Sequence, residues 1–182
     1  TTDITRTYPL GELTEDEKRF YTWTLQSHID LARAVWLDYC ECKMIDTIAR
    51  EPLWRHLINY RCGTGHSVSF VGNVHEGPHA LNGRNTTLMR PGMIVTDEPG
   101  VYETDLVGIR IENELVCVHK ADNQYGTFLG FEPIMFVPIA TSPIVPGVLT
   151  KDELDWLNNY HRQVFEKLAP RLNDEEREWL AK

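Results

Sequence analysis

The sequence has little cysteine and no long apolar run. Its four cysteines are too few and too unevenly spaced for a disulfide scaffold, and no second pair accompanies Cys40-x-Cys42 to make a zinc ribbon. No apolar stretch approaches the roughly 20 residues of a membrane-spanning helix. Because the sequence contains no signal peptide, we expect cytoplasmic location, reduced thiols and no membrane partner.

Positive charge is also scarce. The 18 Lys and Arg residues face 27 Asp and Glu residues, which gives a net charge of −9 and a pI near 5.2. This balance disfavours a nucleic-acid partner, which needs a basic footprint, and docking on anionic lipid. Hydrophobic residues make up 42% of the 182 positions, enough for a globular core. The start, Thr1-Thr2-Asp3, has no Met and no capped element, so we expect the latter part of a larger domain.

Capping signals mark the helices. Thr14 with Glu17, and Thr150 with Glu153, each match the Ser/Thr-x-x-Glu pattern, in which side chains and backbone N–H groups bond reciprocally at a helix start. The expected helices cover residues 14–36, 42–50, 150–168 and a short last piece that Asn173 with Glu176 would cap. Pro52 is expected to interrupt the second helix, because a proline inside a helix removes a backbone hydrogen bond.

Alternation and turn residues mark the strands. The segment from Tyr60 to Gly100 is rich in glycine and proline, which indicates tight turns between short strands. In the clearest strand, apolar residues from Ile109 to Cys117 alternate with polar ones. The expected strands cover residues 1–8, 93–96, 109–120 and 128–139. We therefore predict an α+β fold, with an antiparallel sheet covered by helices on one side.

The polar residues that resist a structural interpretation gather at three places. These are Gly63-Thr-Gly-His66 with His75, Asp97-Glu98-Pro-Gly100, and Arg110-Ile-Glu112-Asn113, with Asp3 as a further candidate. Taken singly, His66 is more often a satisfied core histidine than a ligand, and Glu98 is more often a turn acid. Arg110 and Glu112, two residues apart on a strand, are also explained by a surface ion pair.

Together these residues favour a different interpretation. Glu98 ends one expected strand and Glu112 lies within the next, so a hairpin would bring both carboxylates onto one face of the sheet. Burying two neighbouring carboxylates is costly unless a cation compensates them. Carboxylates with one imidazole suit Mn²⁺, Co²⁺ or Fe²⁺. The residues alone leave a metal site and a solvated strand face as equal alternatives.

Several segments of the chain carry a resemblance to a known family. They are Thr2-Asp-Ile-Thr-Arg-Thr7, Gly63-Thr-Gly-His66, Asn73-Val-His-Glu-Gly-Pro78, Pro91–Gly100, Gly108–Asn113 and the tail 130–160. In this order the segments resemble the pita-bread metallopeptidases, and within them the Xaa-Pro aminopeptidases (aminopeptidases P). The Gly-x-Gly-His motif alone would be a weak signal, whereas five motifs in order over nearly the whole chain are specific.

The resemblance implies an incomplete pita-bread fold and a metallopeptidase that removes an N-terminal residue when proline is second. The implied ligands of two divalent ions are Asp3, His66, Glu98 and Glu112, with Mn²⁺ as the first choice and Co²⁺, Fe²⁺ or Zn²⁺ as alternatives. Glu98 would also act as general base, and His75 would help move protons. The implied substrate contacts are His75, Tyr102 and Arg110.

The resemblance also implies a domain organisation. Residues 1–140 would belong to the catalytic domain, and residues 141–182 would form a helical extension packed on it. The family's first aspartate ligand would precede Thr1, so we expect this chain alone to be inactive or nearly so. The unpaired edge of the N-terminal strand is expected to be covered by a second copy in a homodimer, or by a missing segment of the same protein. Cys62 stands where many relatives place a histidine.

Two other functions are open alternatives at this point. One is a catalytically silent pita-bread module that binds peptides, and the other is a relative without metal, such as creatinase. Neither has a chemical need for four aligned ligands, which favours the enzyme. Prolidase and methionine aminopeptidase share the ligands, and here residues 73–78 and the C-terminal extension favour aminopeptidase P.

Overall fold

A six-stranded antiparallel sheet forms the centre of the computed structural model, which describes residues 1–181. Its strand order is β1-β8-β7-β4-β2-β3, and β5 and β6 form a separate two-stranded sheet. The strands are β1 Val35–Leu37, β2 Gly65–Ser67, β3 Glu76–Leu81, β4 Ile94–Asp97, β5 Gly100–Glu103, β6 Val107–Arg110, β7 Asn113–Asn123 and β8 Gly126–Pro133. The helices are α1 Glu15–Ala32, α2 Cys42–Trp54, α3 Lys151–Leu168 and α4 Asp174–Leu180, with a 3₁₀ turn at Ala169–Arg171.

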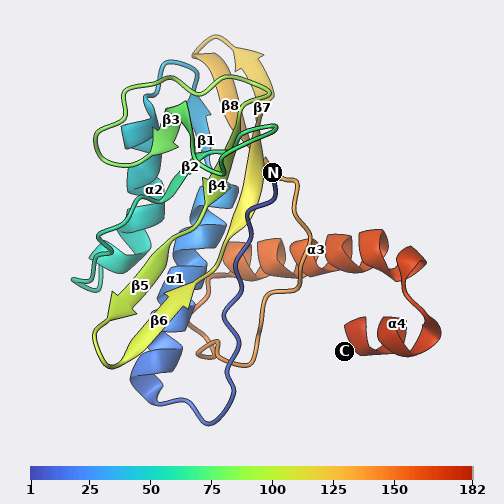
Figure 1. The fold of residues 1–182 in the computed structure, drawn as a ribbon. Helices are drawn as coiled ribbons and strands as arrows, with labels where there is room; N and C mark the ends of the chain where they lie inside the picture. Colours follow the sequence, from blue (N-terminus) through green and yellow to red (C-terminus); the bar gives the residue numbers. More distant parts are fainter. Residues whose placement is uncertain (182) are drawn as a thin grey trace.

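The helices lie on one side of this sheet. Figure 1 shows α1 and α2 behind the strands, while α3 crosses the lower end of the sheet and carries α4 away from it. The predicted α+β class with an antiparallel sheet is confirmed. Within residues 1–181, no helix is both long and apolar enough to cross a membrane.

The capping signals are confirmed at three helix starts. Thr14, Thr150 and Asn173 each accept a hydrogen bond from the backbone N–H three residues later, and the glutamate there bonds back to the cap. These reciprocal bonds satisfy N–H groups that a helix start otherwise leaves without partners. These three helix beginnings are therefore encoded locally.

The ends of the first two predicted helices are wrong. The first helix ends at Ala32, because residues Val35–Leu37 leave it to form an edge strand against β8. There the ring of Trp36 packs 4.6 Å from the ring of Phe131. The second helix continues through Pro52 to Trp54, because the turn after the proline buries Leu53 completely in the core.

Three strand predictions also need correction. The segment 109–120 is two strands, since β6 turns away to pair with β5 while β7 pairs with β4. Strand β8 ends at Pro133 and does not reach residue 139. Residues 1–8 form no strand, and their only β contact among the described residues is a single bridge between Thr5 and Glu112. That bridge nevertheless places the N-terminal segment beside the break between β6 and β7.

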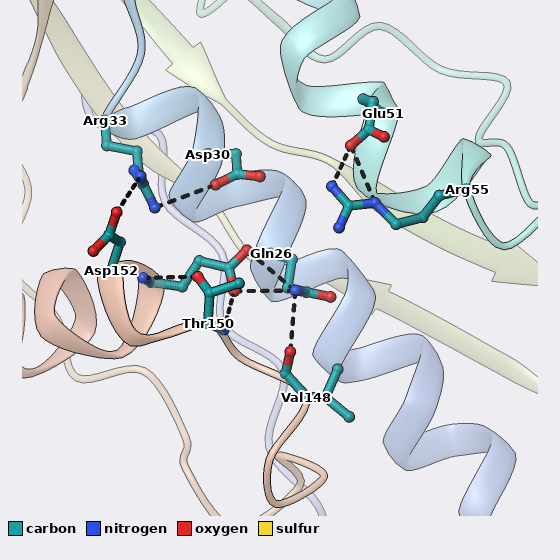
Figure 2. A network of polar contacts seen from close by, with 9 residues as sticks. Gln26, Asp30, Arg33, Glu51, Arg55, Val148, Thr150 and Asp152 are labelled. Atoms are coloured by element: carbon teal, nitrogen blue, oxygen red, sulfur yellow. Dashed lines mark hydrogen bonds and ion pairs between the residues drawn. The ribbon is translucent and has the colours of Figure 1, made fainter.

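Polar contacts fasten α3 to α1, as Figure 2 shows. The amide nitrogen of Gln26 on α1 lies 3.1 Å from each carboxylate oxygen of Glu153, which is the capping glutamate of α3. Both side chains are almost completely buried. Arg33 adds contacts to Asp30 at 3.7 Å and to Asp152 at 3.4 Å. The C-terminal helices are therefore held on the same body that carries the sheet.

Candidate metal centre

Two buried glutamates lie at the ends of neighbouring strands. Asp97 on β4 is the register partner of Asn113 on β7. Glu98 directly follows Asp97, and Glu112 directly precedes Asn113. The antiparallel pairing therefore brings the two glutamates together. Their exposed fractions are 8% and 1%. The predicted approach of the two carboxylates is thus present, with the β5–β6 hairpin connecting them.

His66 on β2 joins Glu98 and Asp3. Its Nε2 atom lies 3.0 Å from Glu98 Oε1 and 3.3 Å from Asp3 Oδ2. Thr96 links His66 to Glu98, because its hydroxyl accepts a hydrogen bond from the His66 N–H and donates one to Glu98 Oε1, both at 2.9 Å. Three of the four predicted metal ligands are therefore in direct contact.

The N-terminal segment holds Glu112, the fourth predicted ligand. The Thr5 hydroxyl donates to Glu112 Oε2, and the Glu112 N–H donates to the Thr5 carbonyl oxygen at 3.0 Å. The Asp3 N–H donates to Glu114 Oε1 at 2.9 Å. The other carboxylate oxygen of Glu112, Oε1, is buried and has no hydrogen-bond partner among the described residues. A buried carboxylate oxygen without a donor is costly unless a cation or another donor compensates it.

Hydrogen bonds and neighbouring charges separate the pKa values of the two buried glutamates. Burial raises the pKa of Glu112 to about 7, against the hydrogen bond from Thr5, and the charges of Glu98 and Asp3 raise it further. Burial acts in the same direction on Glu98, but hydrogen bonds from His66 and Thr96 and the charge of Arg110 leave its pKa below the usual value. Glu98 is therefore the carboxylate that stays ionised at neutral pH, whereas the surroundings of Glu112 disfavour its charged form.

The residues fit a divalent cation in donor type and in charge. Ligand atoms about 2.1 Å from one ion lie about 3 Å from each other, which agrees with the two contacts of His66 Nε2. The carboxylate oxygen of Glu112 without a donor adds a further candidate ligand atom. As they stand, however, no three His, Cys, Asp or Glu side chains within residues 1–181 are grouped to hold an ion. These residues therefore match a divalent cation in chemical type, but their arrangement as a set of ligands is incomplete.

The predicted substrate residues lie beside these acids. Arg110 Nη1 is 3.3 Å from Glu98 Oε2, and its guanidinium lies 5.6 Å from the centre of the Tyr102 ring. The exposed His75 ring is 4.0 Å from the His66 ring, centre to centre. Cys62 is half-buried, and burial raises the pKa of its thiol while the charge of Arg110 opposes that effect. The structure therefore brings all the predicted site residues into one region.

Three further residues at the site, Thr5, Thr96 and Glu114, are not predicted from the sequence. Each positions a predicted ligand by a hydrogen bond and lies within two residues of one in the sequence. The signal for Thr5 and Glu114 was the two-residue alternation with Asp3 and Glu112, which marks side chains on a common face. No local pattern indicates the role of Thr96, because its contact with β2 depends on strand pairing.

Comparison with known families decides the relationship. Residues 1–119 match the family model for metallopeptidase family M24, and residues 127–182 match the model for the C-terminal region of peptidase M24. The chain belongs to metallopeptidase family M24. The predicted resemblance and the pita-bread fold are thereby confirmed.

M24 relatives are similar over the whole chain. Aminopeptidase P2 from Arabidopsis thaliana is 44% identical, over 99% of this chain and 26% of its own length. A probable Xaa-Pro aminopeptidase P from Coprinopsis cinerea is 42% identical, over 99% of this chain and 30% of its own length. The chain therefore spans less than a third of the length of these relatives.

Solved M24 structures share the fold. The X-prolyl aminopeptidase from Caenorhabditis elegans, described as a cytosolic enzyme with a di-nuclear active site, superposes with a TM-score of 0.91 at 36% identity. That comparison covers 99% of this chain and 30% of the other. The Xaa-Pro dipeptidase from Bacillus anthracis gives a TM-score of 0.64 at 28% identity, over 76% of this chain and 36% of its own.

Proposed function

We propose that this chain carries most of the active site of an aminopeptidase that hydrolyses the bond between an N-terminal residue and a following proline. The contact of His66 with Asp3 and Glu98, beside the uncompensated Glu112, is the observation that carries the proposal. Similarity to aminopeptidases P over 99% of the chain supports the same substrate class.

In this proposal Asp3, His66, Glu98 and Glu112 hold two divalent metal ions, with Mn²⁺ as the first choice. When bound, such ions supply Lewis acidity toward the scissile carbonyl and lower the pKa of water. The di-nuclear site of the C. elegans relative supports two ions, and the carboxylate-rich donor set supports a metal that prefers oxygen ligands.

The remaining roles belong to protein groups. Glu98 accepts a proton from the attacking water, and its lowered pKa keeps it ionised for that purpose. His75 binds the substrate and helps move protons from its exposed position beside His66. Arg110 holds Glu98 with one nitrogen, and its partly exposed side chain contacts the substrate. The exposed Tyr102 ring lies next to the Arg110 guanidinium and contacts the substrate.

The proposal also covers the domain organisation, the location and the oligomeric state of the protein. Residues 1–140 act as the catalytic portion, with 141–182 as a helical extension that the Gln26–Glu153 contacts hold on α1. We place the enzyme in the cytoplasm, as the C. elegans relative is described as cytosolic. We also propose a homodimer, because β1 and β3 leave the sheet with two edges unpaired within residues 1–181.

A peptidase assay on the complete polypeptide tests this function. The metal-free protein is supplied with Mn²⁺ and one of two peptides that differ only in Pro or Ala at the second position. We expect release of the first residue from the Pro peptide alone, loss of turnover in Glu98→Gln, and normal turnover in the control Glu175→Gln, whose side chain is exposed on α4. Peptide binding without turnover would instead support the silent binding module, and equal cleavage of both peptides would refute the specificity.

A further inference from the structure

A buried chain of hydrogen bonds runs behind the candidate ligands. Arg6 Nη2 donates to Asn113 Oδ1 at 2.8 Å. Asn113 Nδ2 lies 3.2 Å from His28 Nε2, and His28 Nδ1 lies 3.1 Å from the Asp97 carboxylate and 3.3 Å from its carbonyl oxygen. The side chains of Asn113, His28 and Asp97 are completely buried. The chain thus links the Arg6 guanidinium to Asp97 through an amide and an imidazole.

This chain of bonds joins the segments that carry the ligands. Asp97 and Asn113 are register partners, and each is the immediate sequence neighbour of a candidate ligand, Glu98 or Glu112. Arg6 also donates to the Glu112 carbonyl oxygen at 2.6 Å, from the N-terminal segment that carries the third acid. A change in the Asn113 amide would therefore affect both of the segments that carry Glu98 and Glu112.

Only an amide satisfies the chemistry at position 113. The Arg6 guanidinium can only donate, so the oxygen of the Asn113 amide must face it and the NH₂ group must face His28. His28 Nε2 then accepts a hydrogen bond from the amide N–H, so the imidazole proton lies on Nδ1 and is donated to the Asp97 carbonyl oxygen. An aspartate at 113 would keep the acceptor for Arg6 and lose the donor for His28. The tautomer of His28 therefore depends on this one group.

We propose that Asn113 is a positioning residue for the metal site, because it fixes β4 and β7 in the register that sets Glu98 beside Glu112. This role rests on the proposed function of those two glutamates as ligands. Asn113 itself bonds to the groups behind the site and touches no reacting atom. Partners that orient the ligands of a metal are worth about 10- to 100-fold in metal affinity or activity.

The variant Asn113→Asp separates positioning from simple electrostatics. A second negative charge beside Glu112 would by charge alone tighten the binding of a cation, whereas loss of register would weaken it. Mn²⁺ is titrated calorimetrically into the metal-free complete polypeptide, and the melting temperature of the same metal-free sample is recorded. We expect at least 10-fold weaker Mn²⁺ binding in Asn113→Asp. The control Asn158→Asp adds the same charge at an exposed position of α3 and is expected to bind within twofold of the wild type.

A second variant decides the outcome if Asn113→Asp does not fold. Arg6→Lys keeps the charge but cannot bond at once to Asn113 and to the backbone oxygens of Glu112 and Val137, which the guanidinium fork reaches together. We expect the same loss of affinity, with Arg84→Lys at an exposed position as its control.

The possible results are distinct. Unchanged or tighter Mn²⁺ binding by folded Asn113→Asp, or unchanged binding by Arg6→Lys where the first variant does not fold, would overturn the positioning role and leave the proposed function intact. A wild-type protein that binds no Mn²⁺ would instead overturn the metal function and the role of Asn113 with it.

Discussion

Gly65 and Thr96 approach so closely that a Cβ atom on Gly65 would lie 1.8 Å from the Thr96 carbonyl oxygen. No real Cβ atom makes such a contact, so only glycine allows β2 to lie this near β4. The Thr96 hydroxyl also bonds to His66, the residue that follows Gly65, and to Glu98. The glycine before the histidine is therefore a condition for the contact between two candidate ligands.

The substitution Gly65→Ala is expected to separate β2 from β4. Because the clash is with backbone, it cannot be relieved by a rotamer change, and we expect a loss of about 3 kcal/mol in the free energy of unfolding. Denaturant titration followed by circular dichroism measures it. Gly83→Ala is the matched control, since a Cβ there meets nothing within 4 Å. Equal stability of the two variants would contradict this explanation.

The sequence predicts those parts of the fold and site that depend on neighbours in the chain. The caps at Thr14 and Thr150 are of this kind, as are the motifs around His66 and Glu98. The sequence does not predict the edge strand at Val35, because its partner Gly130 lies far away in the sequence.

The candidate site shows the same limit. Asp3 and Glu112 were named from motifs, but the bridge of Thr5 that holds the N-terminal segment against β7 is a tertiary contact. The alternation in residues 1–8 predicts a full strand, whereas tertiary pairing forms only this isolated bridge. Local chemistry therefore identifies ligands better than it identifies the residues that orient them.

Glu112→Gln is expected to stabilise the metal-free protein while it removes metal binding. The folded pKa of Glu112, about 7, lies above the ordinary value of 4.5, so the folded state resists its ionisation as the pH rises. Removing the charge should therefore add about 1–3 kcal/mol to the free energy of unfolding at pH 8, with a smaller gain near pH 5. Denaturant titration at both pH values, with Mn²⁺ titration in parallel, measures the two effects. A variant less stable than the wild type at pH 8 would refute the prediction.

Asp30 should make the protein less stable as the pH rises from about 4 to 7. Burial, together with the charge of Glu153, raises the pKa of Asp30 to about 6, whereas the ordinary value is 3.8. The folded state therefore binds this proton more tightly than the unfolded chain, and the penalty appears as the group ionises. We expect Asp30→Asn to gain about 1–3 kcal/mol at pH 8 and almost nothing at pH 4, as measured by thermal melting across this range. The exposed Asp155→Asn is the control, and a gain independent of pH would exclude the mechanism.

Glu153 and Glu17 occupy the same place in two capping boxes but should differ in their contribution to stability. Glu17 lies near the surface, so Glu17→Ala should cost about 1 kcal/mol, as loss of a cap usually does. Glu153 is 3% exposed and also accepts both contacts of the buried Gln26 amide, so Glu153→Ala should cost about 3 kcal/mol. Denaturant titration compares them, and equal costs would show that the Gln26 contacts do not stabilise the fold.

The two acids near α1 should also be coupled. The charge of Glu153 contributes to the raised pKa of Asp30, so removing Glu153 should lower that pKa. The stability gained by Asp30→Asn at pH 8 should then be smaller in the Glu153→Ala background than in the wild type. A double-mutant cycle measured at pH 8 and pH 4 isolates this term, since the coupling depends on both groups being ionised. Additive effects at both pH values would mean that burial alone raises the pKa of Asp30.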